Sequence, residues 1–198
     1  MPRAGSKQFS RMPILPQQPD LFPADLFDAD PPAGDGTARW VAFYTLARRE
    51  KDLMRKLRAV AVPFYAPLIR RRLRSGGGRA RESHVPLFAG YVFSRVDDDQ
   101  RRVALATNTI ARWLPIVDEA RLIADLRVIK RLIDADQPLA PEARIEPGQQ
   151  VRVRSGPLRG IEGTVERRHG TQRLVVAVQF LNQGASVELE DVDLETID

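Results

Sequence analysis

Hydrophobic and polar residues alternate with two periods over residues 39–137, one typical of strands and the other of helices. Residues 40–45 are rich in aromatic and β-branched side chains and predict a strand. Residues 50–61 then place apolar side chains three or four positions apart, which predicts an amphipathic helix. Pro63 ends this helix, and a second proline keeps residues 62–69 extended.

The rest of this region repeats the pattern. Residues 85–96 and 110–117 predict strands, and residues 100–107 and 120–135 predict helices. Three aspartates at 97–99 favour a helix N-terminus, where the helix dipole stabilises negative charge. The order β-α-β-β-α-β plus a last helix predicts an α+β fold of the split βαβ, ferredoxin-like kind.

Residues 147–198 show the short alternating segments of an all-β unit. Period-two alternation marks residues 151–154 and 186–192, and residues 173–180 form an apolar run. Gly156, Gly160 and Gly163 are expected at positions of positive φ or close backbone approach. Several strands in about fifty residues predict a small barrel. Pro138 and Pro141 bracket the stretch before it, so residues 138–146 are predicted to be a linker.

Residues 1–38 are rich in proline and lack periodicity, which predicts a disordered tail. The tripeptide Asp-Leu-Phe occurs twice, at 20–22 and 25–27. Such apolar pairs in polar tails are typical of short docking motifs. Residues 18–22, from Gln18 to Phe22, also resemble the pentapeptide by which bacterial proteins dock on the replication sliding clamp. Chance, or packing of these pairs against the folded body, is the alternative interpretation.

Composition excludes several kinds of chemistry. The chain of 198 residues has no cysteine and two histidines, which excludes disulfides, thiolate zinc sites, Fe–S clusters and a cysteine nucleophile. We expect no metal and no cofactor. No apolar run is long enough to cross a membrane, and the first residues lack the apolar core of a signal peptide, so the expected location is the cytoplasm.

Charge is unevenly distributed. The net charge is +5, but residues 37–140 carry net +10, while residues 1–36 carry −2 and residues 141–198 carry −3. Arginine supplies 27 of the 31 basic residues, and its planar guanidinium binds phosphate and stacks on bases. A GC-rich genome would explain the excess of arginine over lysine, but not the segregation. The middle segment is therefore predicted to meet nucleic acid.

Two sets of motifs identify a family resemblance. Residues 151–165 read Val-Arg-Val-Arg-Ser-Gly-Pro-Leu-Arg-Gly-Ile-Glu-Gly-Thr-Val and look like a KOW motif. Residues 40–44, 86–93 and 112–114 resemble the NusG N-terminal domain in order and spacing. Together they resemble the NusG/RfaH family of transcription elongation and antitermination factors over residues 39–198. The resemblance implies a polymerase-binding domain at 39–137 and an SH3-like KOW domain at 147–198.

The resemblance implies a binding site for the clamp helices of the largest RNA polymerase subunit. The matching residues are Phe88, Tyr91 and Phe93, with Phe64 and Tyr65 as neighbours from the preceding strand. Aromatic side chains supply large contact areas at low entropic cost. Burial of some of them in the domain core is the alternative.

Further contacts follow from the same resemblance. Gln100, Arg101 and Arg102 match the run that touches the polymerase gate loop in RfaH-like members, although they lack its hydroxyl groups. Arg48 and Arg49 match a loop that holds non-template DNA; a solvated helix start is the alternative. Residues 70–81 hold six arginines around three glycines, a basic hairpin that would reach upstream DNA or stay a solvated loop. Its leading candidates are Arg70, Arg71, Arg72 and Arg74.

The KOW domain is expected to bind a protein partner. Phe180, Leu181 and Asn182 match the loop by which NusG binds Rho or a small-subunit ribosomal protein. Leu181 keeps an apolar tip while the family's Phe and Gly are replaced, which favours the ribosome over Rho. RfaH-type refolding of the barrel requires an acidic residue where Val85 stands, so a β-barrel at rest is predicted.

These features predict a monomeric regulator of transcription elongation or antitermination, a specialised paralogue of the general factor. The alternative is a KOW-type RNA-binding or ribosome-associated protein that does not bind polymerase. Catalysis is disfavoured, because the sequence offers no phosphate loop, metal-ligand spacing or nucleophile–histidine pair. The aspartates at 97–99 would mimic a Mg²⁺ site, but consecutive side chains point in different directions.

Overall fold

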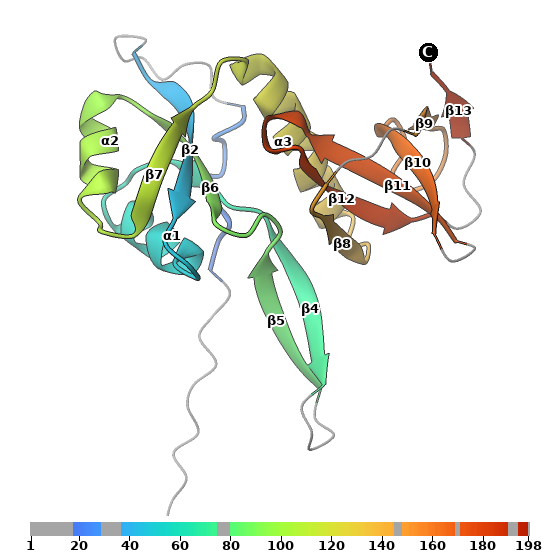
Figure 1. Cartoon of the computed structure of the whole chain (residues 1–198), viewed down its shortest axis with the longest axis horizontal. Coiled ribbons are helices and arrows are strands. Elements are labelled where there is room, and N and C mark those ends of the chain that lie inside the picture. The colour runs from blue at the N-terminus through green and yellow to red at the C-terminus, as the bar shows by residue number, and fades with distance from the viewer. Residues whose placement is uncertain are drawn as a thin grey trace, which may run out of the picture.

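The computed structural model describes residues 18–28, 37–74, 80–144, 148–168, 171–189 and 194–197. Within these residues the chain forms two large antiparallel sheets, a separate two-stranded hairpin and three α-helices (Figure 1). No helix in these ranges is long and apolar enough to cross a membrane.

The N-terminal sheet carries helices on both of its faces. Alternation along strand β2 (Arg39–Thr45) points Phe43 to one face, where helices α1 (Glu50–Ala59) and α2 (Asp98–Leu105) pack, and Ala42 to the other, where helix α3 (Glu119–Asp134) packs. The strand order is β1 (Leu21–Phe22), β3 (Phe64–Tyr65), β6 (Tyr91–Val96), β2 (Arg39–Thr45) and β7 (Ile110–Pro115). The helices are α1 (Glu50–Ala59), α2 (Asp98–Leu105) and α3 (Glu119–Asp134).

Strands β4 (Leu68–Arg74) and β5 (Ala80–Pro86) form a hairpin that projects away from both sheets (Figure 1). The prediction of one strand over residues 85–96 is wrong, because β5 ends at Pro86 and β6 begins only at Tyr91. Gly90 has a φ of +84°, and a Cβ there would lie 3.0 Å from a carbon of the Tyr44 ring. A close approach and a left-handed backbone therefore require glycine at this corner.

The C-terminal sheet has six antiparallel strands. The glycine predictions are confirmed: Gly156 and Gly160 have φ values of +76° and +79°, and a Cβ on Gly163 would lie 2.5 Å from the Val175 carbonyl oxygen. The described residues between 149 and 189 form strands and one 3₁₀ turn, without an α-helix. The strand order is β13 (Leu194–Thr196), β9 (Gln149–Val153), β10 (Glu162–Arg168), β11 (Thr171–Val178), β12 (Gln183–Glu188) and β8 (Leu139–Glu142), with a 3₁₀ turn η1 at Gln179–Leu181.

The stretch expected to be a linker contains a strand. Strand β8 pairs with β12, so Ala185 faces Pro141 across the ladder. A proline is tolerated there because β8 is an edge strand. The linker prediction is therefore wrong for residues 139–142, and residues 145–147 lie outside the described part.

Residues 18–28, which we call the strap, are ordered against the N-terminal sheet rather than disordered. Strand β1 pairs with β3, placing Leu21 opposite Tyr65 and Phe22 opposite Phe64. The strap also buries Leu26 and Phe27, which are 6% and 8% exposed. The prediction of a disordered tail is wrong for these residues, and residues 1–17 and 29–36 lie outside the described part.

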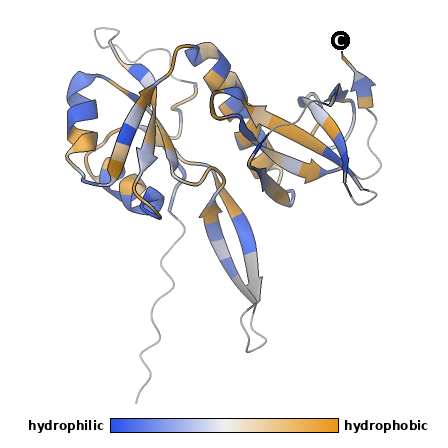
Figure 2. Ribbon diagram, viewed as in Figure 1, coloured by the Kyte–Doolittle hydropathy of each residue, from blue (hydrophilic) through white to orange (hydrophobic). Residues whose placement is uncertain are grey.

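Helix α3 joins the two sheets. Its buried residues belong to one apolar cluster that runs from Phe93 on β6 through Leu126 to Val176 on β11. Figure 2 shows hydrophobic residues on both sheets and along α3 between them. The Arg131 guanidinium adds a 2.9 Å hydrogen bond to the Arg159 carbonyl. The C-terminal sheet is therefore held against α3.

Candidate functional site

Aromatic side chains gather on the face of the N-terminal sheet that is turned toward α3, which we call the aromatic face. Tyr65 lies opposite Phe93, and Phe88 packs edge-on against Phe93 with ring centroids 6.2 Å apart. These three side chains are at most 1% exposed, whereas Tyr91 is half-buried. Four of the five predicted aromatic residues thus come together, and Tyr91 is the accessible one.

Phe64 lies apart from the other four. It points to the opposite face of the sheet, is 1% exposed and stacks on Phe22 at 6.2 Å in the core beneath α1. Adjacent residues of a strand face opposite sides, so Phe64 and Tyr65 do not share a surface. The interpretation of Phe64 as a neighbour of Phe93 on one surface is wrong.

The strap covers one end of the aromatic face. The Phe27 ring stacks on Trp40 at 5.9 Å and meets Tyr65 edge-on at 5.1 Å. The Arg127 guanidinium donates a hydrogen bond to the Phe27 carbonyl. Leu21 and Phe22, proposed to dock on a sliding clamp, are half-buried in this arrangement.

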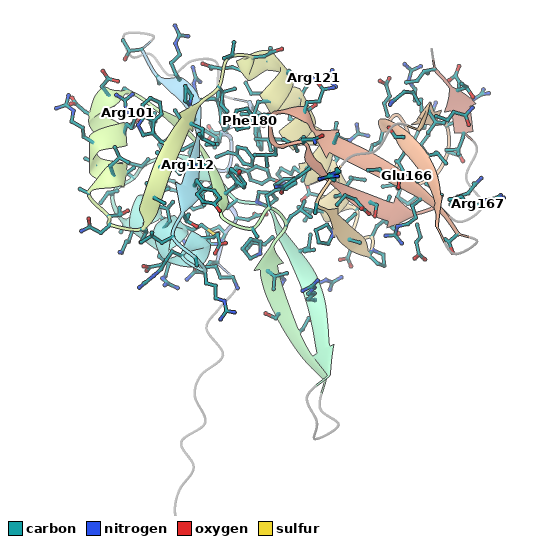
Figure 3. All side chains as sticks on the ribbon, viewed as in Figure 1. Arg101, Arg112, Arg121, Glu166, Arg167 and Phe180 are labelled. Carbon is teal, nitrogen blue, oxygen red and sulfur yellow. The ribbon has the colours of Figure 1, made fainter. Side chains whose placement is uncertain are left out.

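The other end of the aromatic face is open. Tyr44 on β2 lies between Tyr91 on β6 and Arg112 on β7, and the strand register places all three side by side. The Tyr44 and Tyr91 rings are 5.2 Å apart, and the Arg112 guanidinium lies 5.0 Å from the Tyr44 ring. Figure 3 shows Arg112 on the N-terminal sheet. Sequence reasoning missed Tyr44 and Arg112 because no single-strand pattern reveals register between strands.

Tyr65 is held in an apolar setting. Its hydroxyl is buried and has no hydrogen-bond partner among the described residues. Burial raises the tyrosine pKa well above its usual value, and the carboxylates of Asp20 and Asp134 raise it further. The phenol therefore stays neutral and serves packing.

The three residues predicted for the gate-loop contact lie on helix α2, and each of them contacts a neighbouring side chain there. Gln100 closes a capping box with Asp97: its backbone N–H donates to the Asp97 carboxylate at 2.7 Å, and its side-chain oxygen accepts from the Asp97 N–H at 3.2 Å. Arg101 lies 4.5 Å from the Trp113 ring and pairs with Asp98. Arg102 is exposed and pairs with Asp99 at 2.8 Å.

Arg48 and Arg49 lie at the start of α1. Both are exposed, and Arg48 adopts a left-handed φ of +60° in the turn after β2. The Arg49 guanidinium pairs with Asp52 at 3.2 Å, whereas Arg48 forms no ion pair with the described residues. The turn thus presents two cations to solvent, of which only Arg49 is paired within the described residues.

The hairpin arginines do not all face the same way. Arg70 pairs with Asp136 and, at 3.5 Å, with Glu82, so its charge is partly neutralised within the protein. Arg71 is exposed and lies opposite Ser83. Arg72 and Arg74 follow on β4, but their side chains lie outside the described part of the structure.

The predicted partner loop faces α3. Phe180 is 39% exposed and Leu181 packs against the shared apolar cluster, while Asn182 ends η1 in a left-handed conformation with φ of +50°. Figure 3 shows Phe180 on the side of the C-terminal sheet turned toward the N-terminal one. The loop therefore lies at the junction rather than at a free tip.

One carboxylate ties this loop to α3. The Gln179 backbone N–H donates to Asp125 at 2.9 Å, and Arg121 pairs with the other carboxylate oxygen at 3.1 Å. Burial raises the pKa of Asp125, opposed by these two contacts. The Asp125 side chain is only 8% exposed. Its contacts with Arg121 and the Gln179 N–H offset the free-energy cost of removing the carboxylate from water.

Comparison with known proteins identifies the family. Residues 38–134 match the family described as "Transcription termination factor nusG". The transcription termination/antitermination protein NusG of Pseudomonas aeruginosa is 27% identical over 178 residues, covering 80% of this chain and 98% of that protein. The protein of that name from Vibrio cholerae is 31% identical over 132 residues, covering 61% and 70%. The chain belongs to the NusG family, a family of transcription termination and antitermination proteins.

Proposed function

We propose that this protein regulates transcription elongation or antitermination by binding RNA polymerase through its aromatic face. Family membership supports the transcriptional role. The observation that carries the contact is the open row formed by Tyr44, Tyr91 and Arg112 across three strands. An arginine with two tyrosines is the composition enriched at the energetic centres of protein interfaces.

The proposed architecture assigns a role to each sheet. Residues 39–137 form the ferredoxin-like polymerase-binding domain, whose strand order β7-β2-β6-β3 fits that fold. Residues 147–198 form the SH3-like KOW domain. The aromatic face receives the clamp helices of the largest subunit, and α2 reaches the gate loop through Arg102 and, at its edge, Arg101 and Gln100. The protein acts as a monomer and uses no cofactor.

Nucleic-acid contact is proposed at two exposed basic places. Arg48 and Arg49 hold the non-template strand, supported by their exposure and by the lack of an ion pair between Arg48 and any described residue. Arg71 carries the hairpin's contact with upstream DNA, together with Arg72 and Arg74. Arg70 contributes less, because Asp136 and Glu82 already engage it.

The KOW domain is proposed to recruit a small-subunit ribosomal protein through Phe180, Leu181 and Asn182. The exposed Phe180 ring supports this assignment. Its net negative surroundings, with residues 141–198 at −3, favour a protein partner over phosphate.

Replacing Tyr91 tests the polymerase contact most cleanly. Tyr91→Ala is expected to weaken binding to core RNA polymerase by at least tenfold, since interface aromatics of this kind contribute about 2 kcal/mol or more. Binding is measured by fluorescence anisotropy of labelled protein. Phe93 is unsuitable, because truncating a buried phenylalanine costs about 3–5 kcal/mol of stability.

The matched control is Phe180→Ala, which removes an exposed aromatic ring from η1, in the C-terminal part of the chain. It should bind polymerase as the parent does. If Tyr91→Ala and Phe180→Ala both keep the parent's affinity, the aromatic face is not the polymerase site.

A further inference from the structure

Removing the strap would uncover the part of the aromatic face around Trp40 and Tyr65. Phe27 fills the space between these rings and is itself 8% exposed, so it seals this end of the face from solvent. The strap therefore occupies, within the chain, apolar surface of the kind that a partner helix would use.

We propose that residues 18–28 are an intramolecular competitor that covers the aromatic face and must leave before RNA polymerase binds it fully. This inference rests on the proposed function. It concerns regulation: the apparent affinity for polymerase falls by the fraction of molecules in which the face is open.

The strap packs against both faces of the sheet at its edge. Its two Asp-Leu-Phe repeats place Phe22 against Phe64 on the face beneath α1 and α2, called here the helix-covered face, and Phe27 against Trp40 on the aromatic face. Phe22 and Phe27 stand five positions apart in sequence, which lets one segment reach both faces. The repeat singled out in the sequence thus acquires a structural role.

The attachment is short enough to be released. The ladder to the sheet has two residue pairs, extended by a 2.7 Å hydrogen bond from the Ala66 N–H to the Asp20 carbonyl. Residues 29–38 connect the strap to β2, so after release it remains tethered beside its site at a high effective concentration. Such a cover re-forms readily and yields to a partner that buries more surface.

The strap carries features that oppose its own binding. It brings the Asp20 carboxyl toward Tyr65 and Asp134, and burial raises the Asp20 pKa above its ordinary value while Lys130 lowers it. The Tyr65 hydroxyl has no hydrogen-bond partner among the described residues in this arrangement. An unpaired buried hydroxyl and a partly desolvated carboxylate both weaken the packed state.

A reversible cross-link tests the proposal without altering the aromatic face. Phe22 and Phe64 are directly opposite in the ladder, a separation that suits a disulfide, and the chain has no cysteine of its own. Both side chains lie on the helix-covered face. The double variant Phe22→Cys/Phe64→Cys is therefore compared with itself, oxidised and reduced, for binding to core RNA polymerase.

The oxidised, locked protein should bind at least tenfold more weakly than the reduced protein. Because both forms carry the same substitutions, a general loss of packing cancels. Equal affinity of the two forms would overturn the strap's role and leave the polymerase contact standing. No binding by either form or by the parent would instead overturn the proposed function.

A single substitution gives an independent measurement. Phe27→Ala loosens the strap and should tighten polymerase binding several-fold, with Val117→Ala as the control because Val117 is 99% exposed. Weaker binding by Phe27→Ala, in protein shown by thermal unfolding to remain folded, would mean that the strap supports the site rather than covers it.

Discussion

At the residue scale, Tyr91 and Phe93 come from one sequence motif but differ in exposure. Phe93 is buried in the core, whereas Tyr91 is half-buried and remains accessible to a partner. They stand two positions apart on β6 and point to the same face. The alternation was readable in the sequence, and so was the shared face. Their different exposure was not, because it depends on which residues of the strap and α3 happen to cover each ring.

Asp20 is expected to make the stability of the folded protein depend on pH. Burial raises its pKa in the folded state above the ordinary value of 3.8. A raised carboxyl pKa means that folding favours the protonated form. The contribution of Asp20 to stability is therefore most favourable below pH 4 and declines as pH rises through the folded-state pKa.

Asp20→Asn removes the charge and keeps the shape, so it should raise the melting temperature at pH 7. The gain should shrink toward zero as the pH is lowered below 4, where Asp20 is protonated in both states. Thermal unfolding followed by circular dichroism between pH 3.5 and 7.5 measures this. Asp25→Asn, an exposed carboxylate of the same strap, should show no such gain; a pH-independent difference for Asp20→Asn would contradict the explanation.

At the element scale, the sequence predicted the helices and most strands to within a few residues. Local rules suffice there: the aspartate cluster does cap α2, through Asp97, and the apolar period does bury one face of α3. The strand β8 escaped notice because Pro141 indicates a loop unless its strand lies at a sheet edge. Edge position is a tertiary property that the local sequence does not encode.

The strap escaped prediction for a related reason. Proline-rich composition indicates disorder, and only the surface that receives Leu26 and Phe27 makes their burial possible. Of the candidate site, the aromatic residues Tyr91 and Phe93 were therefore predictable, whereas Tyr44 and Arg112 required the register between β2, β6 and β7.

Helix α3 depends on Asp125 for its polar link to η1. Asp125→Ala leaves the Gln179 N–H without its acceptor and should cost the contact about 1.5–3 kcal/mol, the usual range for a hydrogen bond to a charged group. Hydrogen exchange of the Gln179 amide should accelerate by at least tenfold. Asp118→Ala, at the exposed N-cap of the same helix, should leave that amide unchanged; equal exchange in both variants would show that the Asp125 carboxylate does not protect the Gln179 amide.

At the scale of the whole molecule, charge differs between the two halves of the chain. Residues 37–140 carry a net charge of +10 and residues 141–198 a net charge of −3. One apolar cluster includes residues of both segments, so the basic and the acidic segment pack against each other. Phosphate contacts release counterions, and each contact with single-stranded DNA changes the slope of log affinity against log salt by about 0.7. If arginines of this chain contact DNA as proposed, the salt slope counts those contacts.

Arg48→Ala/Arg49→Ala should weaken binding to an elongation complex with an exposed non-template strand, and should reduce the salt slope by about 1.4 if both side chains contact phosphate. Titrations between 50 and 200 mM salt, about the range over which such slopes are measured, give the value. Arg167→Ala removes an exposed arginine from the C-terminal sheet and should leave the slope unchanged (Figure 3). A double variant with the parent's slope would exclude phosphate contact at the start of α1. A slope reduced by half the expected amount would assign the phosphate contact to one arginine. Arg48 is then the expected one, because no carboxylate of the described residues engages it, whereas Arg49 pairs with Asp52.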